Sequence, residues 1–261
     1  MSILHKIITD KKQEVQLKKS SIPVSQLETS VLFNSRTHSL SKLLKNSASG
    51  IIAEHKRRSP SKSIINNNHS IEDVVLGYQK AGVCGISVLT DSKYFGGSLD
   101  DLLLAKAVVN IPLLRKEFIV DEYQILEAKA NGADAILLIA AVLNRKEIKQ
   151  FSEFAKSLNL DVLLEVHNEE ELHKSIMPSL DMLGVNNRNL KTFDVSLDVS
   201  KNLSNLIPND FVKISESGIS NIEAIKELQP YGYQGFLIGE NFMKTDNPGE
   251  SATEFIKSLV G

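Results

Sequence analysis

The amino-acid sequence predicts an α/β protein, a (β/α)8 TIM barrel with a helical N-terminal extension. Three observations lead to this prediction: eight short apolar runs, amphipathic stretches between most of them, and a length of 261 residues. Apolar runs that alternate with helices are typical of a parallel sheet covered by helices. Eight such units favour a closed barrel over an open sheet, and this length is ordinary for one barrel.

Each expected strand is a short apolar run. The runs are "GIIA" at 50–53, "CGISVLT" at 84–90, "IPLLR" at 111–115, "DAILLIA" at 134–140, "DVLLEV" at 161–166, "MLGVN" at 182–186, "FVKIS" at 211–215 and "GFLIG" at 235–239. The helices expected between them include 70–81, 122–133, 144–158, 169–176 and 221–228. Several of these stretches end at Gly or Asn, which are common helix C-caps.

The N-terminal part has a different pattern. Residues 1–48 are polar and helical in character, with a break between Ser20 and Pro23, whereas residues 49–261 carry the strand–helix repeat. No linker or low-complexity tract separates the two parts. We therefore expect one domain, in which residues 1–48 extend a barrel formed by residues 49–261.

Composition narrows the classes of function. Lys plus Arg number 30 and Asp plus Glu number 32, a net charge of −2 that argues against a nucleic-acid binder. The lone Cys84 cannot form an intrachain disulfide, and no signal peptide or membrane-length apolar run is found. These features predict a cytoplasmic protein with neither nucleic-acid nor membrane partners, and an apolar fraction of 42% is enough for a large core.

Five expected strands place apolar residues first and a polar residue last on the same face. Alternate residues of a strand share a face, and barrel active sites lie at the C-terminal strand ends. The sets that share a face are Ile52, Glu54 and Lys56; Leu114 and Lys116; Leu163 and Glu165; Gly184, Asn186 and Arg188; and Ile214 and Glu216. The repetition favours an active-site mouth over five unrelated contacts with solvent.

The residue types in this mouth indicate the chemistry. Two lysines and an arginine favour an anionic small-molecule substrate, and three glutamates can transfer protons. Neighbouring lysines lower one another's pKa, whereas burial raises the pKa of a carboxyl, so both are expected to be tuned toward neutrality. "SESGIS" and "IGENFM" place Gly218 and Gly239 after the last two strands, where barrels commonly bind phosphate.

Eight motifs occur in a specific order and spacing. They are "IIAEHKRRSPSK", "LTDSKYFGGSLDDL", "IPLLRKEFIVDEYQI", "ADAILLI", "LLEVHNEEEL", "GVNNRNL", "ISESGI" and "GFLIGENFM". Over residues 3–260 the chain resembles the indole-3-glycerol phosphate synthase family. The resemblance implies ring closure, decarboxylation and dehydration of 1-(2-carboxyphenylamino)-1-deoxyribulose 5-phosphate in tryptophan biosynthesis. It implies no cofactor and no metal. We expect a monomer, and association with other enzymes of the pathway is left open.

The resemblance also implies residue roles. Lys116 resembles the general acid that protonates the substrate carbonyl, and Lys56 resembles the group that holds the anionic ends and acts as an acid in dehydration. Glu165 is similar to the family's acid/base residue, with Glu54 as its partner in proton handling. The remaining implied site residues are Asn186, Arg188 and Glu216 for positioning; Ser59 in the first loop; Ser217, Gly218, Gly239 and Glu240 for phosphate; and Phe95, Phe118 and Leu137 as apolar walls.

Two positions depart from the family pattern. Lys-Asp-Phe is usual where this chain has Lys116-Glu117-Phe118, and by strand parity Glu117 faces away from the mouth, so little effect is expected. Gly is common at the position of Ser63, where a backbone that needed positive φ would be strained. By the same match, Arg57 and Arg58 face solvent or neighbouring acids.

Three other interpretations fit the residues less well. The spacing of His167 and His173 in "HNEEELH" does not fit helical metal ligation, and Asn168 is interpreted as a helix N-cap. A phosphoribosylanthranilate isomerase would need a Cys/Asp pair on the first and fifth strands, where this chain has Glu54 and Glu165. A non-catalytic barrel would be favoured by loss of a mouth lysine or glutamate, but all the expected positions are filled.

Overall fold

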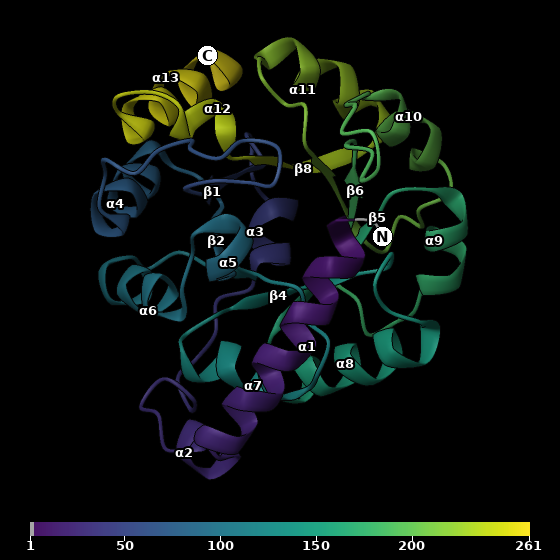
Figure 1. The fold of residues 1–261 in the computed structure, drawn as a ribbon. Helices are drawn as coiled ribbons and strands as arrows, with labels where there is room; N and C mark the ends of the chain where they lie inside the picture. Colours follow the sequence, from purple (N-terminus) through teal and green to yellow (C-terminus); the bar gives the residue numbers. More distant parts are fainter. Residues whose placement is uncertain (1–2) are drawn as a thin grey trace.

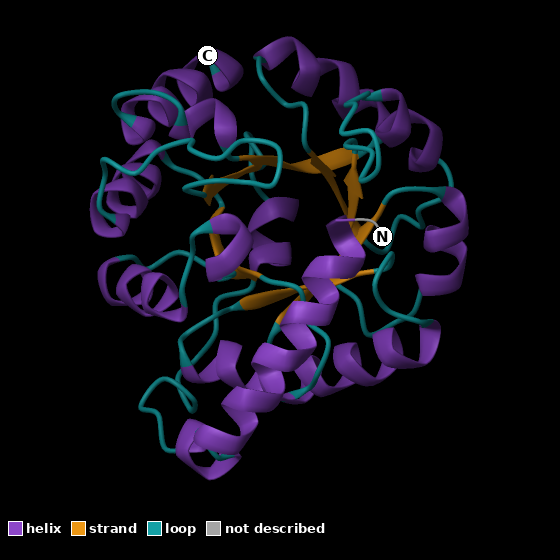
Figure 2. Cartoon of the chain, in the orientation of Figure 1, coloured by secondary structure: helices purple, strands orange, loops and turns teal. Residues whose placement is uncertain are grey.

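The computed structural model describes residues 3–261, and its eight strands form one closed parallel barrel in chain order (Figures 1 and 2). β1 pairs with both β2 and β8, which closes the sheet. The strands are β1 (Ile51–His55), β2 (Gly85–Leu89), β3 (Leu113–Lys116), β4 (Ala135–Ile139), β5 (Asp161–Val166), β6 (Met182–Asn186), β7 (Val212–Glu216) and β8 (Tyr233–Ile238). The predicted fold class and all eight predicted strands are confirmed.

A helix after each strand covers the outside of the barrel (Figure 2). These helices are α4 (Ile71–Ala81), α6 (Leu99–Val108), α7 (Tyr123–Ala130), α8 (Arg145–Ser157), α9 (Glu169–Ser175), α10 (Asp198–Ser204), α11 (Ile222–Leu228) and α13 (Pro248–Val260). Short turns of helix, α5 (Ser92–Phe95), η1 (Gln229–Tyr231) and α12 (Glu240–Met243), lie in the loops. The sequence did not delimit α6, α10 and α13.

Local chemistry explains where these helices begin and end. The Ser70 hydroxyl accepts the Asp73 N–H at the start of α4, and Gly82 ends that helix with a φ of 83°. Asn144 and Glu147 form a capping box at the start of α8. Asn131 ends α7, so the predicted Gly or Asn C-caps are confirmed for α4 and α7.

The strands separate two apolar layers by simple alternation. On β3, Leu113 belongs to the cluster between the sheet and the helices, whereas Leu114 belongs to the cluster inside the barrel. Met182 and Ile214 lie in the same interior cluster. This alternation carries to the strand ends, where it separates inward from outward charges.

The N-terminal segment closes both ends of the barrel. It contains α1 (Ile3–Ser21), α2 (Val24–Glu28) and α3 (Leu40–Lys45), and the predicted break lies between α1 and α2. α1 crosses the barrel opening diagonally in Figure 1. Leu40 and Leu44 of α3 pack into the interior cluster, where they contact the start of the strands. Within residues 3–261, none of the helices combines the length and apolar character of a membrane span.

Candidate active site

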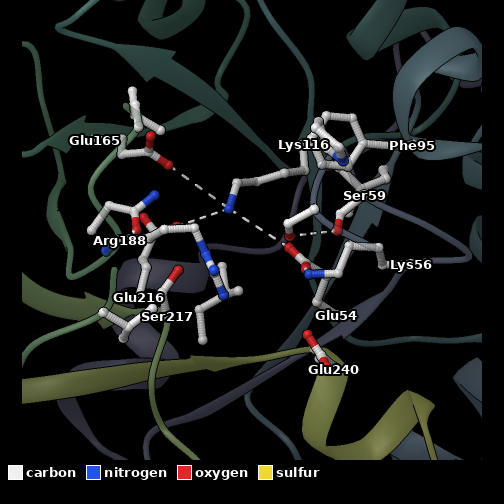
Figure 3. A pocket seen from close by; sticks show the side chains of 18 of the residues that line it. Glu54, Lys56, Ser59, Phe95, Lys116, Glu165, Arg188, Glu216, Ser217 and Glu240 are labelled. Atoms are coloured by element: carbon white, nitrogen blue, oxygen red, sulfur yellow. Dashed lines mark hydrogen bonds and ion pairs between the residues drawn. The ribbon is translucent and has the colours of Figure 1, made fainter. Parts of the chain in front are cut away.

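A pocket of about 400 Å³ opens at the C-terminal ends of the strands, under α1 (Figure 3). All fifteen residues that the sequence and the family resemblance singled out contribute to its lining. They are Glu54, Lys56, Ser59, Phe95, Lys116, Phe118, Leu137, Glu165, Asn186, Arg188, Glu216, Ser217, Gly218, Gly239 and Glu240. Closing the barrel therefore brings together residues that lie up to 186 positions apart in the sequence.

Five of these residues form an ionic network that we call the mouth cluster: Glu54, Lys56, Lys116, Glu165 and Glu216. The Nζ of Lys116 lies 2.8 Å from Glu216 Oε2, 3.6 Å from Glu54 Oε2 and 3.9 Å from Glu165 Oε2 (Figure 3). The other oxygen of Glu54 lies 2.8 Å from the Nζ of Lys56. Glu54 therefore lies between the two lysines and contacts both.

The carboxylates around Lys116 contradict the expectation that a neighbouring lysine lowers its pKa. Burial alone would lower the pKa of Lys116, but the charges of Glu216, Glu54 and Glu165 outweigh it and raise that pKa well above its ordinary value. The expected lowering by a neighbouring lysine is thus wrong for Lys116, because three carboxylates surround its ammonium. The Lys116 side chain in the free site is an ammonium, able to donate hydrogen bonds and a proton.

Two carboxyls of the cluster have pKa values that shift in opposite directions. Burial would raise the pKa of Glu54, but Lys56 and Lys116 outweigh it and lower that pKa, contrary to the expectation for a buried carboxyl. Burial raises the pKa of Glu216 to about 7, as expected, although Lys116 opposes the shift. A Cβ on Gly184 would lie 2.3 Å from Glu216 Oε1, so the absence of a side chain at Gly184 makes room for this carboxyl.

Two turns, one after β7 and one after β8, form a candidate phosphate site. Ser217 and Gly218 have consecutive left-handed backbones, with φ of 65° and 80°, immediately after β7. A Cβ on Gly218 would lie 2.6 Å from Val195 Cγ1. Gly239 precedes α12 as its N-cap, and the Glu240 side chain pairs with Lys62 at 2.9 Å. The pairing leaves the Glu240 carboxylate held toward the first loop.

An apolar wall faces the lysines. The rings of Phe95 and Phe118 lie 6.0 Å apart between centroids and are tilted by 43°. Leu137 from β4 lies in the interior cluster, and Phe118 packs against the same cluster. Two aromatic rings and a leucine beside charged groups suit a flat ring that carries a carboxylate.

The loop after β1 is a tight turn in which Ser59 and Lys62 exchange two backbone hydrogen bonds, of 2.8 and 3.0 Å. Ser63 does not have positive φ, because only Asn159, Phe193 and Ser217 do so among the described non-glycine residues. The strain considered for Ser63 is therefore absent.

The two arginines of this loop have different partners. Arg57 pairs with Asp101 at 2.6 Å, as predicted for a neighbouring acid. Arg58 is partly exposed, and it donates to the backbone carbonyls of Ser92 and Lys93 rather than to an acid.

In the loop after β6, Arg188 makes hydrogen bonds with two other residues. The Arg188 N–H donates to Asn186 Oδ1 at 3.0 Å, and its guanidinium donates to the Phe193 carbonyl at 3.2 Å. The side chains of Leu190 and Val195 from the same loop also line the pocket. This loop contribution was missed, since no periodic pattern marks a loop that folds over a site.

The largest omission of sequence reasoning is the contribution of α1. Its residues Ile3, Leu4 and Ile7 line the pocket, so the N-terminal extension forms part of the site. Lys11, one turn further, is buried and lies 3.0 Å from Asp91 and 3.1 Å from Glu117. The polar, helical character of residues 1–48 did not indicate which end of the barrel α1 would cover.

The carboxylate of Glu117 points away from the mouth cluster, as predicted, although Glu117 also contributes to the pocket lining. It lies in a second buried network that we call the outer cluster: Lys11, Asp91, Arg115, Glu117 and Glu127. Arg115 lies 3.1 Å from Glu127 and 3.7 Å from Glu117. Glu117 also accepts a hydrogen bond from the Thr90 hydroxyl at 2.8 Å. The outer cluster ties α1 to the loops after β2 and β3 and to α7.

Within residues 3–261, no group of three or more His, Cys, Asp or Glu residues could hold a metal ion. Asn168 caps α9 by accepting the Glu171 N–H, so its predicted role is confirmed. His173 is exposed on α9, whereas His167 is nearly buried beside Glu165. The two histidines of "HNEEELH" therefore lie in different environments.

Comparison with known proteins leads to the same family as the motifs. A family model described as indole-3-glycerol phosphate synthase matches residues 4–255. A protein of that name from Bacteroides thetaiotaomicron is 47% identical over 257 residues, which cover 98% of both chains. Another from Aliarcobacter butzleri is 42% identical and covers 98% of this chain and 99% of that protein. A solved structure of 3-hexulose-6-phosphate synthase from Salmonella typhimurium shares the fold, with a TM-score of 0.64, 13% identity, and coverage of 81% of this chain and 98% of that one.

Proposed function

Because the chain belongs to the indole-3-glycerol phosphate synthase family, we propose that its mouth cluster closes the indole ring with Lys116 as the general acid. The chain is a carboxy-lyase of tryptophan biosynthesis. It converts 1-(2-carboxyphenylamino)-1-deoxyribulose 5-phosphate to indole-3-glycerol phosphate, CO2 and water. The observation that carries the assignment of roles is the position of the Lys116 ammonium, which reaches the pocket and contacts three carboxylates.

In the first step, an aryl carbon attacks the substrate carbonyl and a carbon–carbon bond forms. The carbonyl oxygen gains negative charge as its double bond breaks, and the Lys116 ammonium stabilises that charge and gives it a proton. A raised pKa keeps Lys116 protonated before the substrate arrives. The growing basicity of the oxygen then makes the transfer favourable, and the surrounding glutamates stabilise the ammonium again when it regains a proton.

Decarboxylation follows from the attack itself. The attacking ring carbon bears the carboxylate, so the carbon–carboxylate bond breaks, CO2 leaves, and the electron pair of that bond restores the aromatic ring. Phe95, Phe118 and Leu137 form the apolar wall against which this ring would lie. An apolar environment favours loss of a carboxylate as neutral CO2, because the charged form is poorly solvated there.

Dehydration completes the indole. The new hydroxyl leaves as water with a proton from Lys56, while Glu165 removes a proton from the adjacent carbon as the new double bond forms. Lys56 Nζ lies 2.8 Å from Glu54, so Glu54 orients this lysine and balances its charge. Two lysines on opposite sides of one carboxylate thus take the acid roles of two successive steps.

The phosphate end is proposed to bind at Ser217, Gly218, Gly239 and Glu240, through backbone N–H groups. A side chain at Gly218 would disturb this turn, because its Cβ would lie 2.6 Å from Val195 Cγ1 and its φ of 80° favours glycine. Asn186 and Arg188 position the sugar hydroxyls, and Ser59 closes the site from the first loop. We further propose that the protein acts in the cytoplasm and is a monomer of one domain.

A steady-state assay with the carboxyphenylamino sugar phosphate tests this function. The chain has no Trp, so a rise in indole fluorescence reports product alone. We expect turnover at micromolar enzyme without added metal, competitive inhibition by inorganic phosphate, and a raised KM for Gly218→Val. Absence of the fluorescence rise would contradict the function, whereas an unchanged KM in Gly218→Val would place the phosphate elsewhere.

A further inference from the structure

His167 lies between two carboxylates at the rim of the mouth cluster. Its Nε2 is 3.3 Å from Glu165 Oε1, and its Nδ1 is 3.1 Å from Glu171 Oε2. The Glu165 carboxylate is thus closer to this imidazole than to the ammonium of Lys116, at 3.9 Å. None of the roles proposed above uses His167, although it directly contacts the acid/base residue.

Glu171 holds the imidazole from the first turn of α9. Its Oε2 also accepts the backbone N–H of His167 at 2.9 Å, and its Oε1 accepts from the Asn168 amide at 3.1 Å. The Glu171 N–H in turn donates to the capping Asn168 side chain. The carboxylate is therefore fixed by several bonds before it meets His167, and it anchors the ring rather than following it.

These contacts determine which ring nitrogen carries hydrogen. An ionised carboxylate only accepts, so Nδ1, beside Glu171, carries a hydrogen. In neutral imidazole Nε2 then carries only a lone pair, and it lies 3.3 Å from an oxygen of Glu165, outside hydrogen-bond angles. A lone pair and a carboxylate oxygen repel at this distance. A proton on Nε2 turns the repulsion into attraction.

The charges around His167 favour the imidazolium form. Burial alone would lower its pKa, but the hydrogen bond to Glu171 and the charges of Glu165, Glu171 and Glu216 outweigh it and raise that pKa. Among the described residues, Nε2 meets no partner at hydrogen-bond angles, so its contact with Glu165 is electrostatic. An imidazolium here orients the Glu165 carboxylate and balances its charge.

We propose that His167, anchored by Glu171, is a positioning residue that orients the catalytic carboxylate of Glu165 and balances its charge. This inference rests on the proposed role of Glu165 in dehydration. It predicts that removing the imidazole impairs turnover rather than binding, because His167 is not among the residues that line the pocket.

A double-mutant cycle tests the proposal with kcat and KM for four proteins: the unaltered chain, His167→Gln, Glu165→Gln and the double variant. We expect His167→Gln to lower kcat about tenfold with KM within about twofold, a coupling in the usual range for residues in contact. In the Glu165→Gln background, adding His167→Gln should cost no further activity, because its effect passes through Glu165. A purely structural role would lower kcat in both backgrounds.

His173→Gln is the matched control. His173 also lies four residues from a glutamate on α9, with His173 Nδ1 3.9 Å from Glu169 Oε1, but this pair is exposed. We expect no change in kcat, KM or Tm. If His167→Gln fails to fold, Glu171→Gln replaces it in the same cycle. This variant keeps the imidazole but removes the carboxylate that anchors it. We expect a smaller loss of kcat, and none in the Glu165→Gln background.

The outcomes separate this proposal from the function beneath it. Absence of turnover by the unaltered chain would remove both. An active chain with unimpaired Glu165→Gln would overturn the role of Glu165, and this proposal with it. An active chain, an impaired Glu165→Gln and losses that multiply in the double variant would overturn the role of His167 alone.

Discussion

The mouth cluster and the outer cluster each contain three carboxylates and two cations, yet they do different things. Their closest contacts are alike: Lys116 lies 2.8 Å from Glu216, and Lys11 lies 3.0 Å from Asp91. The two lysines differ in access to solvent. The side chain of Lys116 is 14% exposed and lines the pocket, whereas that of Lys11 is 2% exposed on the covered face of α1. Charge and distance alone therefore do not distinguish the two lysines, whereas access to a cavity does.

Strand β3 separates the two clusters by one residue. Arg115 points outward into the outer cluster, and Lys116 points inward to the mouth cluster. Alternation along a strand assigns the face, and only closure of the barrel makes one face a pocket and the other a sealed layer. The comparison predicts that equivalent substitutions in the two clusters affect different quantities.

The largest effect is expected for Lys116→Met. It should lower kcat by roughly 10³-fold with little change in the fold, because a methionine gives neither charge nor proton to the carbonyl oxygen. Lys116→Arg should recover little, since a guanidinium rarely gives up a proton near neutral pH. Lys56→Met should spare kcat more and raise KM more. If the two lysine variants exchanged these effects in steady-state assays, their roles would be reversed.

In the outer cluster, Lys11→Met should affect stability rather than chemistry. It leaves Asp91 buried without its cation and Glu117 with only the more distant Arg115, a change that typically costs about 3 kcal/mol of unfolding free energy. Urea unfolding followed by circular dichroism measures the loss. Lys93→Met is the matched control, because Lys93 ties the loop after β2 to Asp10 of α1 through an exposed pair. Equal losses in the two variants would show that burial is not the cause.

His55 extends the comparison to the outward face of β1. Burial and the charge of Arg57 lower the pKa of this histidine to about 4, from an ordinary value near 6.5. Below that ordinary value the unfolded chain binds a proton that the folded chain does not, so acidification destabilises the fold through this group. Between about pH 7 and pH 5 we expect a loss of about 2 kcal/mol from His55.

Urea unfolding of the unaltered chain and of His55→Gln at these two pH values checks this expectation. The variant should lose about 2 kcal/mol less on acidification. His173→Gln should keep the full dependence, because His173 is exposed. Parallel pH dependence in the unaltered chain and His55→Gln would exclude His55 as the source.

The smallest effect is expected for Glu117→Asp, which introduces the residue usual in the family. The shorter side chain would lengthen the 3.1 Å contact with Lys11, at a cost of less than about 1 kcal/mol in unfolding free energy. Because Glu117 faces away from the mouth cluster, kcat should stay within about twofold. A large fall in kcat with unchanged stability would mean that the outer cluster takes part in the chemistry.

By itself, the sequence determined the eight strands, the inward face of each and the motifs of the family. Period-2 alternation and strand-end charges are local features, and they are enough to place Glu54, Lys116 and Glu165 on the inward side of their strands. The helix caps at Gly82, Asn131 and Asn168 are local in the same way, because each depends on the bonds of neighbouring residues.

Only the tertiary structure decided how far apart the charges lie and what α1 covers. The pKa of Lys116 rises because Glu54, Glu165 and Glu216 converge on it from three other strands. The spacing of these residues in the sequence does not reveal their distances from Lys116. Because α1 crosses the mouth of the barrel and not its other end, Ile7 lines the pocket and Lys11 anchors the helix to Asp91. Electrostatics and burial depend on separations in space, which a chain acquires only on folding.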